Sequence, residues 1–421
     1  MTDKHSSKPD PIASLRRPSF LLYVVGSLLS NTGNQMRLTV ANWDVWEITH
    51  SKLHVGYVGL VLALPVLLFA LPAGAAADRY SRRGMIMLGQ AGLALSGLGL
   101  AWAAWTSASL WLYYLFLFGT GAFRALGWPA ATAIVADLVP PRVFSNAAMW
   151  RSVSWQLAAT LGPLAGALVL AYFGSALVYI VDAVSSVILM VCMLFVRTSP
   201  HKRVAEPKSW RSLIEGIHYL RRQPVLLSTM WLDMVAVLFG GATALLSIYA
   251  TEVLGVGAFG YGWLRAMQPL GAIFMGLLLA VLPPIRHGGK TLLWAVVAFG
   301  VATIVFGLSK SYPLSLAALF LAGAADNISV VIRATVLQLL TPNSMRGRVS
   351  AVSVIFIGTS NEIGEFESGL AAEWLGLVPA VTLGGVMTLV TVGVVARVWP
   401  ELRRLGSLEH LQPPEPTNIV E

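Results

Sequence analysis

Hydrophobic residues form about twelve long runs along the chain, and short polar segments separate the runs. A helix needs about 20 apolar residues to cross the hydrocarbon core of a bilayer, so these runs predict membrane-spanning helices. We expect a first set of spans at 19–48, 54–77, 84–105, 110–138, 143–172 and 175–197. A second set is expected at 225–252, 259–282, 290–308, 313–340, 348–375 and 378–398.

The polar segments divide the chain into two halves with six spans each. The predicted regions are an N-terminal tail, 1–17, a first half, 18–197, a linker, 198–224, a second half, 225–399, and a C-terminal tail, 400–421. Within the linker, apolar residues recur at helical spacing at Trp210, Leu213, Ile214 and Ile217. This spacing indicates either an amphipathic helix on the membrane surface or a solvated linker helix.

The second half repeats features of the first half. Residues 115–119 (Leu-Phe-Leu-Phe-Gly) match residues 319–323 (Leu-Phe-Leu-Ala-Gly). In nearly the same register, residues 162–163 (Gly-Pro) fall on residues 364–365 (Gly-Glu), 202 positions later. Two six-helix halves in parallel repeat are typical of secondary transporters, which bind substrate near the midplane between the halves. We therefore expect an all-α membrane protein with twelve transmembrane helices in two pseudo-symmetric halves.

Basic residues are distributed unevenly, and this distribution predicts the orientation. Segments on the side of the two tails carry 22 of the 29 Lys+Arg, whereas segments on the other side carry only Lys52 and Lys310. Short cytoplasmic loops are enriched in Lys and Arg, so both tails are expected in the cytoplasm.

Composition narrows the class of protein further. Only 12% of the residues are charged and 56% are hydrophobic, which leaves too little polar surface for a soluble protein of this size. The net charge of +9 lies in loops facing lipid headgroups, so nucleic acid is a disfavoured partner. The single Cys192 excludes a disulfide framework or thiol metal site.

A motif follows the second span, where residues 74–84 read Gly-Ala-Ala-Ala-Asp-Arg-Tyr-Ser-Arg-Arg-Gly. It resembles the signature loop of the major facilitator superfamily, except that Ser81 replaces the usual glycine. Physically, Gly74 permits close helix approach and Asp78 suits a helix N-terminus. The candidate residues of this gating loop are Gly74, Asp78, Arg79, Arg82 and Arg83, with Asp137 as an acidic partner. The resemblance implies that the loop closes the cytoplasmic gate, although the arginines could instead only set topology.

Two further motifs favour export. Gly162, Pro163 and Gly166 resemble the Gly-Pro-x-x-Gly motif of antiporter branches, although ordinary helix packing explains them nearly as well. Residues 49–51 and 338–349 resemble the branch that contains the enterobactin exporter and macrolide-efflux carriers. The resemblance covers about residues 18–400 and implies an inner-membrane efflux carrier of the drug:proton antiporter type, linked to siderophore export or multidrug resistance.

Ionisable residues inside the spans are candidates for the transport site, because they are costly in lipid and normally face the bundle interior. Glu362 and Glu365 are three residues apart and share a helix face. Two carboxylates this close do not both ionise easily, so one of them is expected to carry the coupling proton. The alternatives are a permanent ion pair with Arg265 or Arg333, or contact with a cationic substrate. The candidate proton carriers are Glu365, Glu362, Asp326 and Asp233.

Arginine, amide and tryptophan residues are candidates for the substrate cavity. The resemblance implies that the spans carrying them line this cavity. An anionic or catechol-like cargo would suit the arginines, and a cation would suit the acids of 348–375. The candidate residues are Arg37, Asn34, Arg124, Trp128, Arg151, Trp263, Arg265 and Arg333.

The resulting hypothesis is a proton-coupled exporter of a small amphipathic molecule in a bacterial inner membrane, acting as a monomer. An uptake carrier, a translocator of lipid-like molecules and a non-transporting membrane sensor are the alternatives. An enzyme is disfavoured because the chain has no complete Gly-x-x-x-x-Gly-Lys-Ser/Thr phosphate loop and no catalytic or metal-ligand constellation. We therefore expect no cofactor and no metal.

Overall fold

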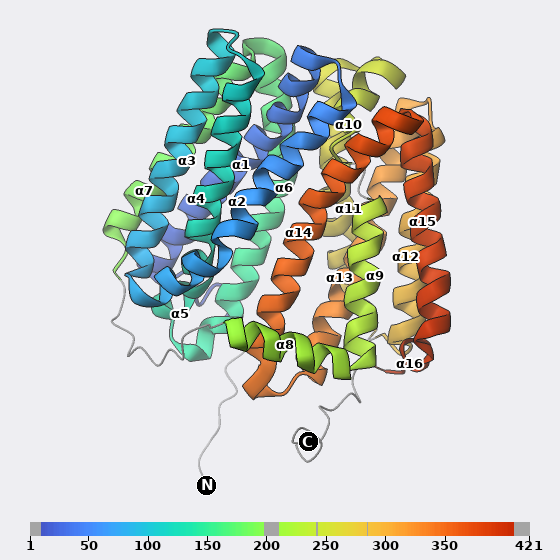
Figure 1. The fold of residues 1–421 in the computed structure, drawn as a ribbon. Helices are drawn as coiled ribbons and strands as arrows, with labels where there is room; N and C mark the ends of the chain where they lie inside the picture. Colours follow the sequence, from blue (N-terminus) through green and yellow to red (C-terminus); the bar gives the residue numbers. More distant parts are fainter. Residues whose placement is uncertain (1–9, 198–209, 241–242, 284, 408–421) are drawn as a thin grey trace.

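The computed structural model of the chain describes residues 10–197, 210–240, 243–283 and 285–407, and this part is helical without strands (Figure 1). Each run of apolar residues is long enough for a helix whose backbone hydrogen bonds are satisfied within the segment, as a bilayer requires. The helices gather into two bundles that lie side by side (Figure 1).

The first bundle contains six long helices. α1 packs against α6 and α7, α3 packs against α4 and α7, and α2 packs against α4. Two short segments, α5 (Val135–Leu138) and the 3-10 turn η1 (Pro141–Val143), connect α4 to α6. The long helices are α1 (Pro18–Thr49), α2 (Lys52–Arg79), α3 (Arg82–Trp105), α4 (Leu110–Ala133), α6 (Phe144–Phe173) and α7 (Ser175–Phe195).

The second bundle is built in the same way. α11 packs against α13, α12 packs against α13 and α15, and α9 packs against α14 and α15. The long helices are α9 (Pro224–Gly240), α11 (Gly257–Val281), α12 (Gly288–Leu308), α13 (Tyr312–Leu340), α14 (Asn343–Leu375) and α15 (Leu377–Val398). The shorter elements are α10 (Leu246–Ile248), the π-helical turn η2 (Tyr249–Val253) and α16 (Pro400–Arg404).

The helix α8 (Trp210–Arg222) runs crosswise beneath one end of the molecule, where α5 and α16 also lie (Figure 1). We call this the linker end and the other the opposite end. α8 buries Tyr219 and Leu220 and exposes Ile214 and Ile217. The side chains of Trp210 and Leu213, and the residues 198–209, lie outside the described part of the chain, so the predicted amphipathic face is seen only in its second half.

Eight helices of the described chain are long and apolar enough to cross a membrane, or nine if the strongly bent pair Ile214–Arg222 and α9 counts as one span. The remaining main helices are α1, α4, α9 and α14. α9 has only 17 residues, and each of the other three carries charged side chains. The observed helices agree with the expected spans to within a few residues, apart from two expected spans that are broken.

The two broken spans are corrections to the sequence prediction. The expected span 225–252 consists of α9, then α10 and the π-helical turn η2. The expected span 110–138 ends as α4 at Ala133 and continues as the short α5. Both runs are predominantly apolar, and hydropathy does not register a change of backbone direction within such a run.

Candidate functional site

The two bundles meet along two helix pairs, and the first pair is α2 with α14. Glycines on α2 bring these backbones together. A methyl group on Gly56 would lie 3.1 Å from the Gly369 Cα atom. A methyl group on Gly59 would lie 2.6 Å from the carbonyl oxygen of Glu362 and 2.7 Å from the Glu365 Cβ atom. Only glycine fits at this distance, so the seam depends on the absence of side chains.

Other contacts close the same seam toward the opposite end. The rings of Tyr57 and Phe366 stack with their centroids 5.8 Å apart. Nearer the end of the helices, the backbone N–H of Leu53 donates to the Glu373 carboxylate at 3.4 Å. These residues belong to the first turns of α2 and the last turns of α14, so the closed region lies at the opposite end.

The second seam joins α6 to α11. A methyl group on Gly262 would lie 2.3 Å from the Ala167 Cβ atom and 3.1 Å from the Pro163 carbonyl oxygen. The neighbouring Tyr261 hydroxyl donates to the carbonyl oxygen of Thr39 in α1 at 3.0 Å. This seam also lies in the part of each helix that is nearer the opposite end.

The internal repeat relates the two seams. Glu365 follows Pro163 by 202 residues, and Gly262 follows Gly59 by 203 residues. In each seam, a glycine of one half packs against a helix of the other half. The repeat makes α2 equivalent to α11, and α14 equivalent to α6. The halves differ at the contact itself, because the first half presents a proline and the second half presents a carboxyl group.

The packing is different nearer the linker end. A methyl group on Gly74 of α2 or on Gly358 of α14 would meet no atom of the described residues within 4 Å. The close helix approach that we expected at Gly74 is therefore wrong for this conformation. In the described part of the chain, α2 and α14 are therefore in close contact toward the opposite end. Toward the linker end, there is open space beside their glycines.

An ion pair crosses between the halves at the inner margin of the first seam. Arg124 of α4 pairs with Glu362 of α14, and both side chains are largely buried. One turn away, the Glu365 carboxylate accepts a hydrogen bond from the Thr243 hydroxyl at 3.4 Å, and the charges of Arg265 and Arg124 act on it. Four predicted residues, Arg124, Arg265, Glu362 and Glu365, are thus brought together where the halves meet.

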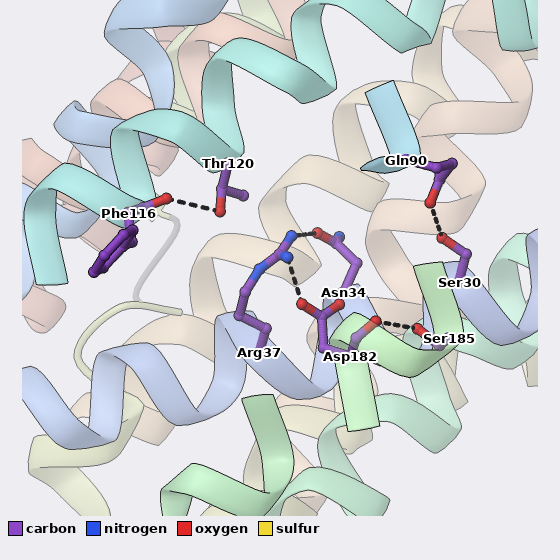
Figure 2. Close-up of polar contacts among 8 residues, drawn as sticks. All are labelled: Ser30, Asn34, Arg37, Gln90, Phe116, Thr120, Asp182 and Ser185. Atoms are coloured by element: carbon purple, nitrogen blue, oxygen red, sulfur yellow. Dashed lines mark hydrogen bonds and ion pairs between the residues drawn. The ribbon is translucent and has the colours of Figure 1, made fainter. Parts of the chain in front are cut away.

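A second ion pair stays within the first half. The fully buried Arg37 donates to Asp182 of α7 at 2.5 Å and to the side-chain oxygen of Asn34 at 2.5 Å (Figure 2). Ser185 donates to the Asp182 carbonyl oxygen from the other side (Figure 2). Arg37 and Asn34 therefore contact protein in this conformation, and they tie α1 to α7.

The second half contains a corresponding pair. Arg333 of α13 pairs with Asp233 of α9. The alternative in which Arg333 forms a permanent ion pair with the acids of α14 is therefore not supported, because Arg333 pairs with Asp233. Asp326, seven residues before Arg333, is half-buried and has no hydrogen-bond or ion-pair partner among the described residues.

The remaining predicted cavity residues are more accessible. Trp128 of α4 and Trp155 of α6 are exposed and meet edge to face with their centroids 6.4 Å apart. Arg151 is exposed one turn before Trp155. Trp263 lies beside the second seam and is 37% exposed. Trp128, Trp155 and Arg151 thus form an accessible group in the linker-end parts of α4 and α6.

The predicted gating loop forms a defined set of contacts. Arg82 donates to the Asp137 carboxylate at 2.8 Å and to the Ala133 carbonyl oxygen at 3.0 Å. Arg83 donates to the carbonyl oxygen of Leu194 at 2.8 Å. These contacts tie the start of α3 to α4, α5 and the end of α7, and the Arg82–Asp137 pair is the one that the charges suggested.

Two other positions of the loop have separate roles. Ser81, which replaces the expected glycine, accepts a hydrogen bond from the Gly84 N–H at 3.2 Å and so caps α3. Arg79 is exposed beside the ring of Tyr80. The side chain of Asp78 lies outside the described part of the chain.

The predicted antiporter motif packs against α1. A methyl group on Gly162 would lie 2.4 Å from the Gln35 Cβ atom, and one on Gly166 would lie 3.0 Å from the Met36 Cα atom. Gly364, which follows Gly162 by 202 residues, packs in the same way against the Leu238 carbonyl oxygen of α9 at 3.1 Å. The glycines of the motif thus hold equivalent helix pairs together in both halves.

Sequence reasoning missed the seam glycines Gly56, Gly59 and Gly262. Gly56 and Gly59 are three residues apart, which places them on one helix face. That spacing was a usable signal for close helix packing. It did not indicate which helix would be the partner.

The fold and the charged interface define a class of membrane transporter of the major facilitator type. A family model described as "Transmembrane secretion effector" matches residues 9–418. The chain therefore belongs to this family of the major facilitator superfamily, and it is a transporter rather than an enzyme. The predicted fold class is confirmed.

Relatives and solved structures agree with this family. The chain is 27% identical over 367 residues to the enterobactin exporter EntS of Shigella flexneri, covering 86% of this chain and 87% of the relative. It is 26% identical over 363 residues to the same exporter of Escherichia coli O1:K1, with the same coverage.

Among solved structures, a bacterial homolog of the human lysosomal transporter Spinster, inward-facing and occupied, has a TM-score of 0.72 at 18% identity. That match covers 97% of this chain and all of the other. A peptide transporter of the POT family, in complex with sulfate, has a TM-score of 0.72 at 13% identity, covering 92% and 95%. At these identities the likeness concerns the fold.

Proposed function

We propose that this protein is a proton-coupled exporter of a small amphipathic molecule of the siderophore type, working by alternating access. The linker end would face the cytoplasm of a bacterium, the chain would reside in the inner membrane, and it would act as a monomer. The observation that carries the proposal is the Arg124–Glu362 ion pair between the halves, beside Glu365 and a seam that closes only at the opposite end.

The conformation supports alternating access. The seams are closed by backbone contacts of Gly56, Gly59 and Gly262, whereas Gly74 and Gly358 border open space nearer the linker end. Rocking of the halves would reverse this arrangement, so that α2 and α14 part at Gly59 and approach at Gly74. The described structure then corresponds to the state that is open toward the cytoplasm.

The asymmetry of the two seams supports proton coupling. Opening of the α2–α14 seam would separate Glu362 from Arg124 and expose Glu362 and Glu365 to the outside, where each can take up a proton. Re-forming the ion pair requires Glu362 to be ionised again, so closure releases its proton toward the cytoplasm. The α6–α11 seam has Pro163 in place of Glu365 and takes no part in this exchange.

The cargo is proposed from the chemistry of the interface. Arg265 has a buried guanidinium nitrogen that lacks a hydrogen-bond partner among the described residues, and Arg151 is exposed beside Trp155. Arginines with accessible tryptophans suit a planar, electron-rich or anionic molecule. Similarity to enterobactin exporters points to a catechol siderophore, and a cargo that competes for Arg124 would loosen the seam from within.

The test is substrate-linked proton flux in proteoliposomes. Purified protein would be reconstituted with a pH-sensitive dye inside, and enterobactin would be added with and without a pH gradient. Wild type would be compared with Glu362→Gln, Glu365→Gln and Asp326→Asn, and Glu367→Gln is the matched control on α14. We expect wild type to move protons against substrate, and at least one of the three acid variants to bind substrate yet lose the proton flux.

Two results would refute the proposal. Proton flux that is unchanged in the three acid variants would exclude these carboxyl groups as carriers. Substrate movement along the proton flux, rather than against it, would favour the uptake alternative. Asp326 is tested with the glutamates because a carboxylate without a countercharge among the described residues is costly in a membrane.

A further inference from the structure

A groove of about 520 Å³ lies between α12 and α13. It is separate from the seams between the halves, because among the described residues α12 packs mainly against α13 and α15 of the second half. Its walls come from one face of α12, including His287, Lys290, Trp294 and Ala298, and from the middle of α13. The groove is therefore on the flank of the second bundle rather than between the bundles.

The groove has a polar end and an apolar length. His287 and Lys290 lie at the start of α12, at the linker end. Trp294 follows one turn later and is 72% exposed, and Ala298 lies one turn beyond it. At about 1.5 Å per residue, Lys290 and Ala298 are about 12 Å apart along the helix. A molecule that fills the groove must have a polar head near Lys290 and an apolar part beyond it.

The polar end is cationic and unoccupied by protein. Lys290 is exposed and has no acidic partner among the described residues. Three further exposed arginines belong to this end. Arg286 is four residues before Lys290, and Arg403 and Arg404 lie in α16, which contacts α12. The backbone fixes that proximity, because Gly288 donates to the Gly406 carbonyl oxygen at 2.9 Å.

We infer that this groove is a binding site for an anionic phospholipid, with the phosphate at Lys290 and His287 and an acyl chain along Trp294 and Ala298. Basic pockets between transmembrane helices on the cytoplasmic side bind anionic headgroups. A lysine with a long apolar stem reaches the headgroup region while its helix lies in lipid. The assignment to the inner leaflet rests on the proposed orientation of the linker end, but the binding itself does not.

The choice of a lipid over a soluble anion follows from the lining. Beyond the cationic end, the groove is walled by Trp294, Ala298, Ala325 and Ile328. A small soluble anion would leave this apolar length unfilled. An acyl chain fills it and is covalently joined to the phosphate that Lys290 attracts.

The test is native mass spectrometry of the full-length protein in detergent, titrated with phosphatidylglycerol and, separately, with phosphatidylcholine of the same acyl chains. We expect the tightest-bound phosphatidylglycerol to be held more strongly than phosphatidylcholine. A lysine near an anionic lipid surface contributes about 1 kcal/mol, so Lys290→Gln should weaken that binding about fivefold. Lys290 is exposed, so this variant should fold normally.

Two further variants make the test specific. Lys310→Gln removes an exposed lysine at the opposite end of the same helix pair and should leave lipid binding unchanged. Ala298→Phe fills the apolar length and should weaken both lipids. Equal binding of the two lipids by wild type, or an equal effect of the Lys290 and Lys310 substitutions, would overturn the inference. No transport measurement enters, so the proposed function can fail without affecting this result.

Discussion

At the scale of single residues, the buried ion pairs fall into two groups. Some join helices of one half, and one joins helices of different halves. Arg37–Asp182 and Arg333–Asp233 each join helices of one half. Arg124–Glu362 joins helices of different halves. Pairs of the first kind can persist throughout a transport cycle, whereas the crossing pair must break whenever the halves separate.

The pair within the first half is expected to be structural. Removing one partner of a buried ion pair leaves an uncompensated charge and typically costs about 3–5 kcal/mol. Asp182→Asn should therefore lower the thermal unfolding temperature in detergent sharply. The double variant Arg37→Met, Asp182→Leu should recover much of the loss, because hydrophobic replacements of both partners are often neutral. A double variant that is as unstable as Asp182→Asn would contradict this interpretation.

The crossing pair is expected to control the seam rather than the stability of either half. Arg124→Glu and Glu362→Arg each place like charges together and should open the α2–α14 seam. The double variant restores opposite charges and should close it again. Spin labels at His50 and Leu375, both exposed at the opposite end, would report the opening as a longer distance. A distance that is the same in all four proteins would exclude a gating role for the pair.

The sequence predicted part of this residue-scale picture. The spacing of charges indicated that an arginine of the gating loop would meet Asp137, and Arg82 does so. It also indicated that the intramembrane arginines would face the interior of the bundle, which holds for the buried Arg37 but not for the exposed Arg151. It did not indicate that Arg124 would reach Glu362, because pairing between halves depends on the angle at which two independently folded bundles meet.

At the scale of helices, the seams depend on glycines whose positions are state-specific. Gly59 lies against the α14 backbone, whereas a methyl group added to Gly74 on the same helix would have no neighbour within 4 Å. An added side chain is therefore expected to act in opposite directions at the two ends of α2.

Paired substitutions test this expectation. Gly59→Val overfills a close contact, which typically costs about 1–3 kcal/mol, and should shift the population toward the state open at the opposite end about fivefold or more. Gly74→Val meets no neighbour in the described conformation and should disfavour the state closed at the linker end. Labelling of single cysteines from each side of the membrane would show which end is accessible. If both variants shift accessibility in the same direction, the two-state assignment is wrong.

Hydropathy predicted the helices well and their interruptions poorly. The starts and ends of α3, α7, α13 and α15 follow the apolar runs, because a bilayer leaves an apolar segment few alternatives to a helix. The break between α9 and η2 was not predicted, since the residues on both sides are equally apolar. In the structure α10 and η2 contact α11, and α9 contacts α13, and a single-helix pattern does not encode such neighbours.

At the scale of the whole molecule, two repeated bundles carry the same packing motif and differ in the charged residues near the seams. Gly162 and Gly364 hold equivalent helix pairs, and Gly262 and Gly59 form equivalent seams. Where the first half has Pro163, the second half has Glu365. The repeat relates the two seams, but only the α2–α14 seam has carboxyl groups beside it, because α6 and α11 carry no acidic residue.

The most direct test of alternating access is to measure the distances across both ends of the molecule in one experiment. Spin-label pairs at His50 and Leu375 for the opposite end, and at Tyr80 and Arg286 for the linker end, would be followed in nanodiscs by double electron–electron resonance. On adding enterobactin, we predict that the distance at the opposite end lengthens while the distance at the linker end shortens. We also predict that Glu362→Gln changes the proportions of the two conformations that these distances report. Two distances that change in the same direction, or do not change with substrate, would contradict alternating access through these seams.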